Sequence, residues 1–426
     1  MSAESAKEFK KKKPTRFALD YSARFYPVIA SRKAQSIFCV GAELNDEIDK
    51  SLLCDAVNDV IPRFPSLKVR IRKGYGWHYL ENNDERVKVF DIDGRMLRPI
   101  DPHETNGYWF RLACRGRRVQ VDMFHALTDG NGAIAFLKSV LMRYRELQGV
   151  VFDDKTGIID WQETPDEQET EDSFEKYYKP VALKDIDLKS IAGGVPHRMK
   201  GTPVDNGYLS ILGSADAVAI LKNAKALDAS FTSYIVGMLA YTIEQVSGGS
   251  KPIVMMIPVN LRSIFPSKTM RNFVTFVRVI IRPSTLKTPE EFVKEAQRQL
   301  SEKAHKNKME EFISTTVRAQ GSLILRCVPL FLKIFFVKLG RLFMRSRQTI
   351  IYSNLGRHSV PDGLGVKRFI FNMNVSKNNP QNVGSVTVGD EAVFAFTKAI
   401  KENDLNDAFF DNLRSCGVAV EVAKTE

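Results

Sequence analysis

The stretch FHALTDGNG, residues 124–132, decides the fold prediction because it joins two segments with different periodicities. Before it, residues 109–124 (WFRLACRGRRVQVDMF) alternate apolar and polar side chains around a glycine, which predicts a β-hairpin. After it, residues 132–147 (GAIAFLKSVLMRYREL) repeat apolar side chains at helical spacing and stop before Gly149. The stretch is therefore predicted to be a strand-to-helix junction that carries His125 and Asp129.

The chain has 426 residues, which predicts two domains of roughly 200 residues each. Strand-like and helix-like segments alternate in both halves, so we expect an α/β (α+β) fold with two lobes. Residues 151–176 are acidic and polar without a sustained period, which is typical of a surface linker. The predicted divisions are an N-terminal lobe at 1–160, a linker or crossover at 161–205, and a C-terminal lobe at 206–426.

Composition limits the partners and the compartment. The sequence has 62 Lys and Arg against 50 Asp and Glu, and this net charge of +12 favours an anionic partner. Its five cysteines form no CxxC pair, so we expect reduced thiols in a cytoplasmic protein rather than a disulfide framework. No apolar segment follows the basic run at 10–13, so we expect no signal peptide.

One long apolar segment, residues 322–344 (SLILRCVPLFLKIFFVKLGRLFM), resembles a membrane span but is interrupted by charged residues and Pro329. A spanning helix needs about 20 nearly uncharged residues, so we reject a span. The pattern predicts an amphipathic helix. Packing in the core or between the lobes is favoured, and peripheral contact with a lipid surface is the alternative.

Known chemical motifs are mostly absent. The sequence contains no GxSxG, GxxxxGK[ST], HExxH or post-strand GxGxxG pattern, so serine nucleophiles and nucleotide hydrolysis lack sequence support. His125 and Asp129 supply only two metal ligands, and the other histidines are scattered, so no metal site is expected. Taken alone, HALTDG also fits an ordinary Asp-Gly turn.

His125, Asp129 and Gly130 resemble the HxxxDG motif of the CoA-dependent acyltransferase superfamily. This superfamily includes chloramphenicol acetyltransferase, alcohol acetyltransferases and nonribosomal-peptide condensation domains. Further resemblances follow in the superfamily's order, namely RFPSLKVRI (63–71), IPVNLRSIFP (257–266) with Asn272, and TIIYSNLG (349–356). FALDYSARFYP (17–27) resembles the start of bacterial alcohol-acetyltransferase-like proteins. The doubled histidine of condensation domains and the DFGWG of plant enzymes are missing, which favours the alcohol-acetyltransferase-like branch.

The resemblance implies two chloramphenicol acetyltransferase-like lobes with a channel between them. CoA would enter from one mouth and the acceptor from the other, with the motif histidine midway. A histidine suits general-base catalysis near neutral pH, and direct transfer needs no cysteine or serine nucleophile. Asp129 could bond His125 as in a catalytic triad. The resemblance instead implies a structural ion pair between Asp129 and Arg262, which we adopt.

Other candidate site residues follow from their positions. Ser353 and Asn354 are candidates for polar contacts with the acceptor or an oxyanion, and capping of a strand end is an equal alternative. Asn272 is a candidate for substrate binding, with a turn hydrogen bond as its alternative. Four residues near the expected junction are candidates for the CoA phosphates, although each could be an ordinary surface charge: Lys268, Arg271, Arg357 and His358.

These inferences predict a CoA-dependent acyltransferase. We expect it to move an acetyl or short-chain acyl group from acyl-CoA to an alcohol or amine on a small-molecule acceptor, as a monomer without a metal. The enzymatic alternative is a stand-alone condensation-type enzyme that uses a carrier-protein-bound thioester. A member that has lost catalysis and acts as a binding or scaffold protein is a further alternative. Nucleic-acid binding is not expected, because only the net charge and the basic run at 10–13 favour it.

Overall fold

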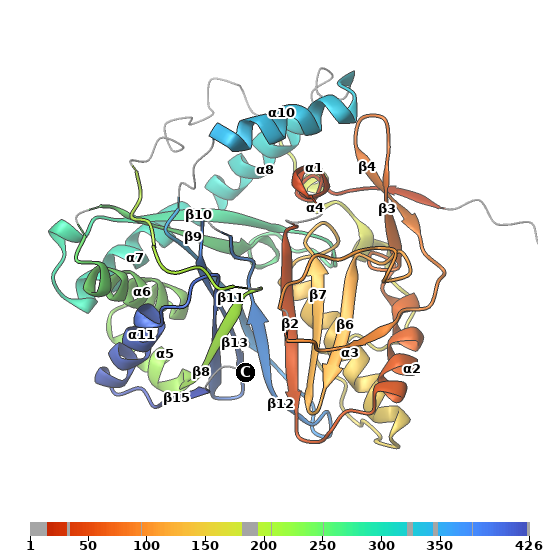
Figure 1. The fold of residues 1–426 in the computed structure, drawn as a ribbon, viewed down its shortest axis with the longest axis horizontal. Coiled ribbons are helices and arrows are strands. Elements are labelled where there is room, and N and C mark those ends of the chain that lie inside the picture. Colours follow the sequence, from red (N-terminus) through yellow and green to blue (C-terminus); the bar gives the residue numbers. More distant parts are fainter. Residues whose placement is uncertain are drawn as a thin grey trace, which may run out of the picture.

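The structure is a computed structural model that describes residues 15–31, 35–94, 96–180, 195–205, 207–249, 251–321, 327–343, 348–376 and 378–423. Figure 1 shows two lobes side by side, each with a β-sheet and helices on its outer face. The predicted mixed α/β fold with two lobes is confirmed.

The N-terminal lobe is built on a five-stranded sheet in the order β12-β2-β7-β6-β5. Its own strands are β2 (Ile37–Leu44), β5 (Val89–Asp91), β6 (Phe110–Arg115) and β7 (Arg118–Phe124). Helices α2 (Lys50–Val60) and α3 (Gly130–Leu147) cover this sheet. A separate three-stranded sheet consists of β1 (Arg16–Ala18), β4 (His78–Asn82) and β3 (Val69–Lys73). The predicted hairpin at 109–124 is β6 and β7.

The C-terminal lobe is built on a seven-stranded sheet in the order β10-β9-β11-β13-β14-β8-β15. Its strands are β8 (Leu209–Asp216), β9 (Ile253–Asn260), β10 (Val274–Ile281), β11 (Ile350–His358), β13 (Gln381–Val388), β14 (Glu391–Lys398) and β15 (Val420–Ala423). Four helices lie on its outer side in Figure 1: α5 (Ala217–Ala226), α6 (Phe231–Ser247), α7 (Pro289–Lys303) and α11 (Asp404–Ser415). The described residues also form the α-helices α1 (Phe25–Ile29), α4 (Ser173–Lys176), α8 (Lys306–Gly321) and α10 (Leu330–Phe343).

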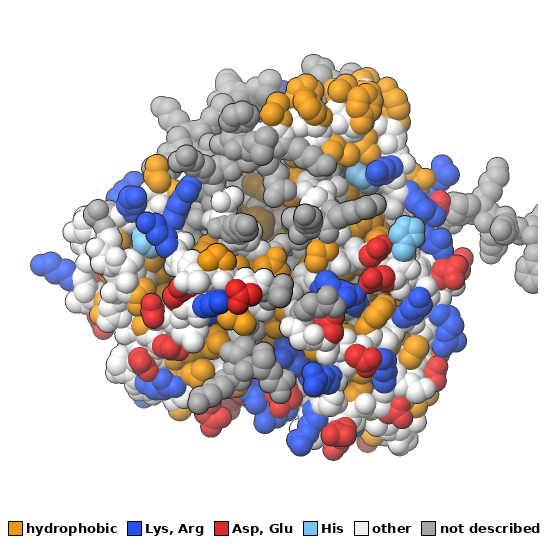
Figure 2. Space-filling model, viewed as in Figure 1, with side chains coloured by type: hydrophobic (Ala, Val, Ile, Leu, Met, Phe, Trp, Pro, Cys, Tyr) orange, Lys and Arg blue, Asp and Glu red, His pale blue; other side chains and the backbone are white. Residues whose placement is uncertain are grey.

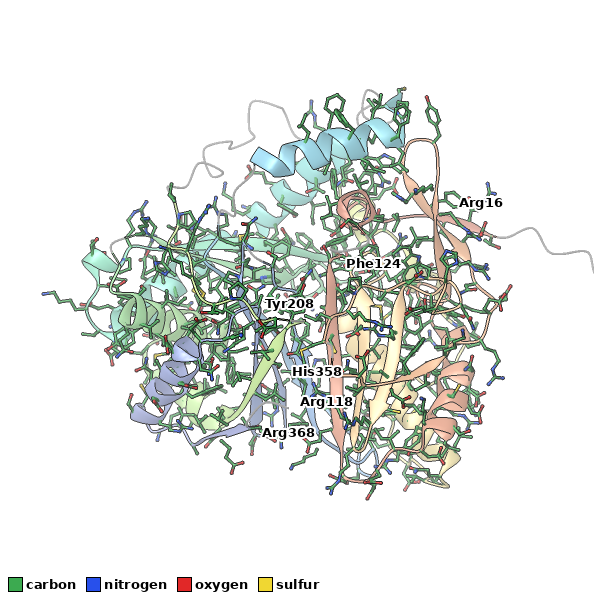
Figure 3. All side chains as sticks on the ribbon, viewed as in Figure 1. Arg16, Arg118, Phe124, Tyr208, His358 and Arg368 are labelled. Atoms are coloured by element: carbon green, nitrogen blue, oxygen red, sulfur yellow. The ribbon has the colours of Figure 1, made fainter. Side chains whose placement is uncertain are left out.

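Strand β12 (Val366–Asn372) belongs to the C-terminal half of the chain but pairs antiparallel with β2 in the N-terminal sheet. Arg368 on this strand forms an ion pair with Glu43 (Nε to Oε2, 2.9 Å) and donates to Ser214 Oγ at 3.0 Å, so it contacts both lobes. Figure 3 shows Arg368 where the two sheets approach each other. The predicted C-terminal lobe at 206–426 includes β12, which the structure places in the N-terminal sheet. Pairing between strands hundreds of residues apart leaves no local pattern in the sequence.

The acidic segment 151–176 packs against the fold instead of forming a free surface linker. Glu169 receives two hydrogen bonds from the buried Arg63, at 2.5 and 2.8 Å. Phe174 is fully buried and makes an edge contact with Phe273 at 5.5 Å. Its sequence shows no helical or strand-like spacing of apolar residues because its backbone is mostly irregular. Its carboxylates form ion pairs with cations of both lobes.

The apolar segment predicted at 322–344 contains α10, although residues 322–326 and 344 lie outside the described part. Phe331, Phe335 and Phe336 are exposed by 68%, 58% and 62%. The favoured prediction that this helix packs in the core or between the lobes is therefore wrong for its outer face. Within the described residues, no helix has both the length and the apolar character required to cross a membrane.

Candidate active site

The strand-to-helix junction positions the motif residues at the boundary between the lobes. Strand β7 ends at Phe124, and the backbone N–H of His125 donates to Ser36 O at 2.9 Å. Asp129 is the N-cap of α3, and its carboxylate accepts a hydrogen bond from Gly132 N at 3.2 Å. The motif spacing thus places His125 on the turn and Asp129 at the helix start.

Gly130 and Gly132 allow the C-terminal lobe to approach this helix start closely. A Cβ on Gly130 would lie 2.4 Å from Leu355 Cδ2. A Cβ on Gly132 would lie 2.0 Å from Thr128 Oγ1 and 2.7 Å from Met270 O. Larger residues would force these groups apart, so both glycines have a packing role at the lobe boundary.

Asp129 forms the predicted ion pair with Arg262. The Arg262 Nη1 atom lies 2.7 Å from Asp129 Oδ2, and the Asp129 side chain is almost fully buried. The same oxygen accepts a hydrogen bond from Phe273 N at 3.0 Å. Arg262 also donates to the carbonyl oxygens of Thr269 (3.0 Å) and Arg271 (2.5 Å). The carboxylate therefore holds the 262–273 loop against α3.

The ring of His125 is fixed on three sides. Tyr26 stacks on it with ring centroids 4.7 Å apart, and Phe38 makes an edge contact at 4.9 Å. The Nδ1 atom lies 2.9 Å from Asn272 Oδ1. An amide oxygen only accepts hydrogen bonds, so Nδ1 carries the proton and Nε2 has a free lone pair.

The environment keeps the imidazole of His125 neutral. Burial lowers its pKa below the ordinary value of 6.5. The backbone of His125 itself, then the charge of Asp129 and the Asn272 side chain, partly oppose this shift. A neutral imidazole with a free Nε2 can accept a proton from a reacting hydroxyl or amine at neutral pH.

Asp20 lies behind Asn272, and sequence reasoning did not single it out. Its carboxylate is buried, which raises its pKa to about 6, while the Arg271 charge and the Asn272 side chain lower it. Asp20 Oδ2 and Asn272 Nδ2 are both buried, and neither atom has a hydrogen-bond partner among the described residues. We infer that the carboxylate attracts the amide nitrogen and so turns the amide oxygen toward His125. The segment 17–27 carries a resemblance, but nothing in it distinguishes this aspartate.

A cavity of about 660 Å³ lies between the lobes, and His125 is part of its wall. Aromatic and polar side chains from both lobes line it, including Tyr26, Phe38, Tyr208, Ser353, Asn354 and Phe371. Figure 3 shows Phe124, the neighbour of His125, and Tyr208 near the centre of the molecule. An apolar cavity with a few converging polar groups is typical of a small-molecule site.

Ser353 and Asn354 line the cavity, so their contact with an acceptor or oxyanion stays a prediction, and Asn354 also caps the irregularity in β11. Its Oδ1 accepts from Gly356 N at 2.8 Å, and its Nδ2 donates to Thr232 Oγ1 at 3.3 Å. Asn272 is absent from the cavity wall and contacts the histidine instead. The described residues contain no group of three or more His, Cys, Asp or Glu side chains arranged to hold a metal ion.

Two of the four predicted phosphate contacts need correction. Arg271 is buried and donates to the carbonyl oxygens of Ala18 (2.6 Å) and Thr170 (3.2 Å), so it faces the interior. Burial and the charge of Lys138 lower the pKa of His358 to about 4, so its ring is neutral near pH 7 and supplies no cation. Both corrections arise because burial depends on tertiary packing.

Lys268 and Arg357 remain candidates for binding an anion. Lys268 is exposed and pairs with Asp166 at 2.8 Å, and Arg357 is exposed and lies 3.3 Å from Asp390. Neither residue belongs to the cavity wall, so a contact with them would occur outside it.

The Asp129–Arg262 pair should couple strongly in a double-mutant cycle. Asp129→Ala and Arg262→Ala should each lower the free energy of unfolding by about 3–5 kcal/mol, because each leaves a buried charge without its partner. The double variant should lose less than the sum of these two losses. Chemical denaturation measures all three values. Asp205→Ala, which removes an exposed partner of Lys401, is the control and should have little effect; strict additivity at 129 and 262 would contradict the pair.

No protein-family profile matches the chain, and no curated protein matches it. Solved structures do match its fold. TRI3 trichothecene 15-O-acetyltransferase from Fusarium sporotrichioides aligns with TM-score 0.60 and 9% identity over 95% of this chain and 94% of that one. The first condensation domain of the calcium-dependent antibiotic synthetase gives TM-score 0.59 and 12% identity over 94% and 95%.

Polyketide synthase associated protein 5 from Mycobacterium tuberculosis aligns with TM-score 0.55 and 15% identity over 88% of this chain and 93% of that chain. These matches extend over nearly the whole of each protein, so both lobes correspond. The chain therefore has the two-lobed fold that condensation domains share with CoA-dependent acyltransferases, as the HxxxDG resemblance predicted.

Proposed function

We propose that this protein is an acyltransferase that moves an acyl group from a thioester directly to a hydroxyl or amine of a small molecule. The observation that carries the proposal is the state of His125 on the cavity wall. Its Nδ1 is held by Asn272, and burial keeps the ring neutral. This arrangement leaves Nε2 as the free base in a cavity that both lobes line.

In the proposed reaction, His125 Nε2 accepts the proton of the acceptor as its oxygen or nitrogen attacks the thioester carbonyl. The tetrahedral intermediate then collapses, the carbon–sulfur bond breaks, and the leaving thiolate takes the proton from the imidazolium. The Asn272 oxygen and the negative charge of Asp129 both favour the transient imidazolium. General-base help of this kind contributes typically about 10²–10⁴-fold to the rate.

The proposed donor is acetyl-CoA or another short acyl-CoA. The exposed cations Lys268 and Arg357 and the net charge of +12 support it, because CoA carries phosphates. The proposed acceptor is an alcohol or amine with an apolar body, since aliphatic and aromatic side chains together form much of the cavity wall. A carrier-protein-bound thioester is the alternative donor. It is kept because condensation domains are among the structures that share this fold. A binding protein without catalysis would not require the held, neutral imidazole.

The variant His125→Ala should lower turnover at least about 100-fold while the protein stays folded, because the proton acceptor is lost. Release of free thiol from mixed acyl-CoAs in the presence of an acceptor library, with product masses, measures this. His103→Ala, which changes an exposed histidine, is the control and should retain activity. Alanine substitutions of the five cysteines should also retain it. A folded His125→Ala protein with unchanged activity, or an acyl group trapped on a cysteine, would contradict direct transfer.

The pH profile should report the same histidine. Burial lowers the pKa of His125, so the acidic limb of kcat/KM should lie below pH 6.5, and activity should be lost as pH falls through it. In Asn272→Asp, a carboxylate next to Nδ1 favours the imidazolium, so the limb should move to higher pH. Initial rates across a pH series measure both positions. A limb that does not move in Asn272→Asp would argue against contact between residue 272 and the base.

Phosphate recognition should separate CoA from a carrier-bound donor. The apparent KM for acyl-CoA should rise with ionic strength, since exposed charges are screened over about 8 Å at physiological salt. Lys268→Ala or Arg357→Ala should raise KM for acyl-CoA and leave the acyl-pantetheine reaction unchanged. Arg298→Ala, on the exposed side of α7, is the control. If acyl-pantetheine serves the unmodified protein as well as acyl-CoA, the carrier-bound alternative is favoured.

A further inference from the structure

Helix α10 exposes large apolar side chains and buries a lysine. Its outer side carries Phe331, Leu332, Phe335, Phe336 and Leu339, which are all exposed; we name these residues the α10 apolar face. Lys333 points inward, and its ammonium donates to Gly76 O at 2.6 Å and lies 4.1 Å from the centre of the Trp77 ring. A surface helix usually buries its apolar side and exposes its charges. The reverse arrangement indicates an apolar partner outside the fold.

The apolar surface continues beyond the helix. Tyr75, in the turn between β3 and β4, is 75% exposed, and its carbonyl oxygen accepts a hydrogen bond from Leu330 N at 2.7 Å. Phe25 of α1 is also exposed and makes an edge contact with Trp77 at 5.7 Å. Figure 2 shows hydrophobic side chains gathered at this edge of the molecule, over α10. Soluble proteins rarely leave a large contiguous apolar patch without a partner.

The part of the chain around α10 is cationic in sequence. Residues 312–361 contain no Asp or Glu but eight Lys and Arg: Arg318, Arg326, Lys333, Lys338, Arg341, Arg345, Arg347 and Arg357. A segment without Asp or Glu that also carries exposed aromatic side chains would complement a partner surface with an anionic outer layer and an apolar layer below it. An anionic bilayer has this structure, with acyl chains under phosphate head groups.

The length of α10 determines how it would meet a bilayer. Its 14 residues extend about 21 Å, which is shorter than the hydrocarbon core of about 30 Å. A helix of this length with one apolar side lies in the plane of the interface, with that side among the upper acyl chains.

We propose that the α10 apolar face is a docking surface for an anionic lipid bilayer. Phenylalanine side chains would enter the interface, and the excess of Lys and Arg over Asp and Glu in this part of the sequence would favour anionic head groups. Helix α10 packs against α1, whose Tyr26 stacks on His125, so the docked bilayer would lie beside the helix that forms part of the cavity wall.

Co-sedimentation of the full chain with vesicles tests the docking surface. Binding should be strong to vesicles of equal parts phosphatidylglycerol and phosphatidylcholine, weak to phosphatidylcholine alone, and reduced by high salt. Combined Phe331→Ser, Phe335→Ser and Phe336→Ser substitutions should weaken binding at least about tenfold, because apolar area no longer leaves water. The matched control is Val218→Ser with Leu221→Ser, which changes exposed apolar residues of α5 and should bind as the unmodified protein does.

A conservative reporter gives a second measurement that does not depend on how the triple variant folds. Phe335→Trp should show a blue shift of its added fluorescence on anionic vesicles. An unmodified protein that ignores these vesicles, an unshifted reporter, or a folded triple variant that binds normally would overturn the proposal. Self-association without lipid that the triple variant abolishes would instead assign the surface to a protein contact. None of these readouts requires acyl transfer, so they are independent of the proposed activity.

Discussion

The rest of the site depends on the interactions of the Asp129 carboxylate. It caps α3 through Gly132, pairs with Arg262, and accepts the backbone N–H of Phe273. These bonds join the helix start of one lobe to a loop of the other. A buried carboxylate is stable only when cations and N–H groups surround it, so its partners cannot be placed independently.

The same loop delivers Asn272 to His125, and this links lobe assembly to the state of the base. Arg262 holds the carbonyl oxygens of Thr269 and Arg271, which fixes the backbone just before Asn272. Tyr26 and Phe38 then fix the ring plane, and Asn272 fixes the protonated nitrogen. The histidine therefore gains its orientation from the α1 segment, strand β2 and the C-terminal lobe.

Helix α1 occupies an unusual position in this arrangement, because it contacts both the ring of His125 and α10. The segment before it carries Asp20, whose carboxylate lies 3.6 Å from Arg271 and has its pKa lowered by the Asn272 side chain. A short N-terminal segment thus connects the exposed apolar edge of the molecule with the groups around the base. This geometry gives the early FALDYSARFYP segment a structural purpose that its sequence did not reveal.

The sequence by itself determined the local elements and the motif. Alternation predicted the hairpin that ends at Phe124, helical spacing predicted α3, and the order of the resembling segments predicted the fold and the Asp129–Arg262 pair. Only the tertiary structure decided which side chains are buried. Arg271 is buried, and burial lowers the pKa of His358 so that its ring is neutral near pH 7. Strand β12 pairs with the sheet of the N-terminal lobe, and the phenylalanines of α10 are exposed. The spacing of apolar residues shows which side of a helix or strand is apolar. The burial and the pKa of a side chain depend on the residues, distant in sequence, that pack against it.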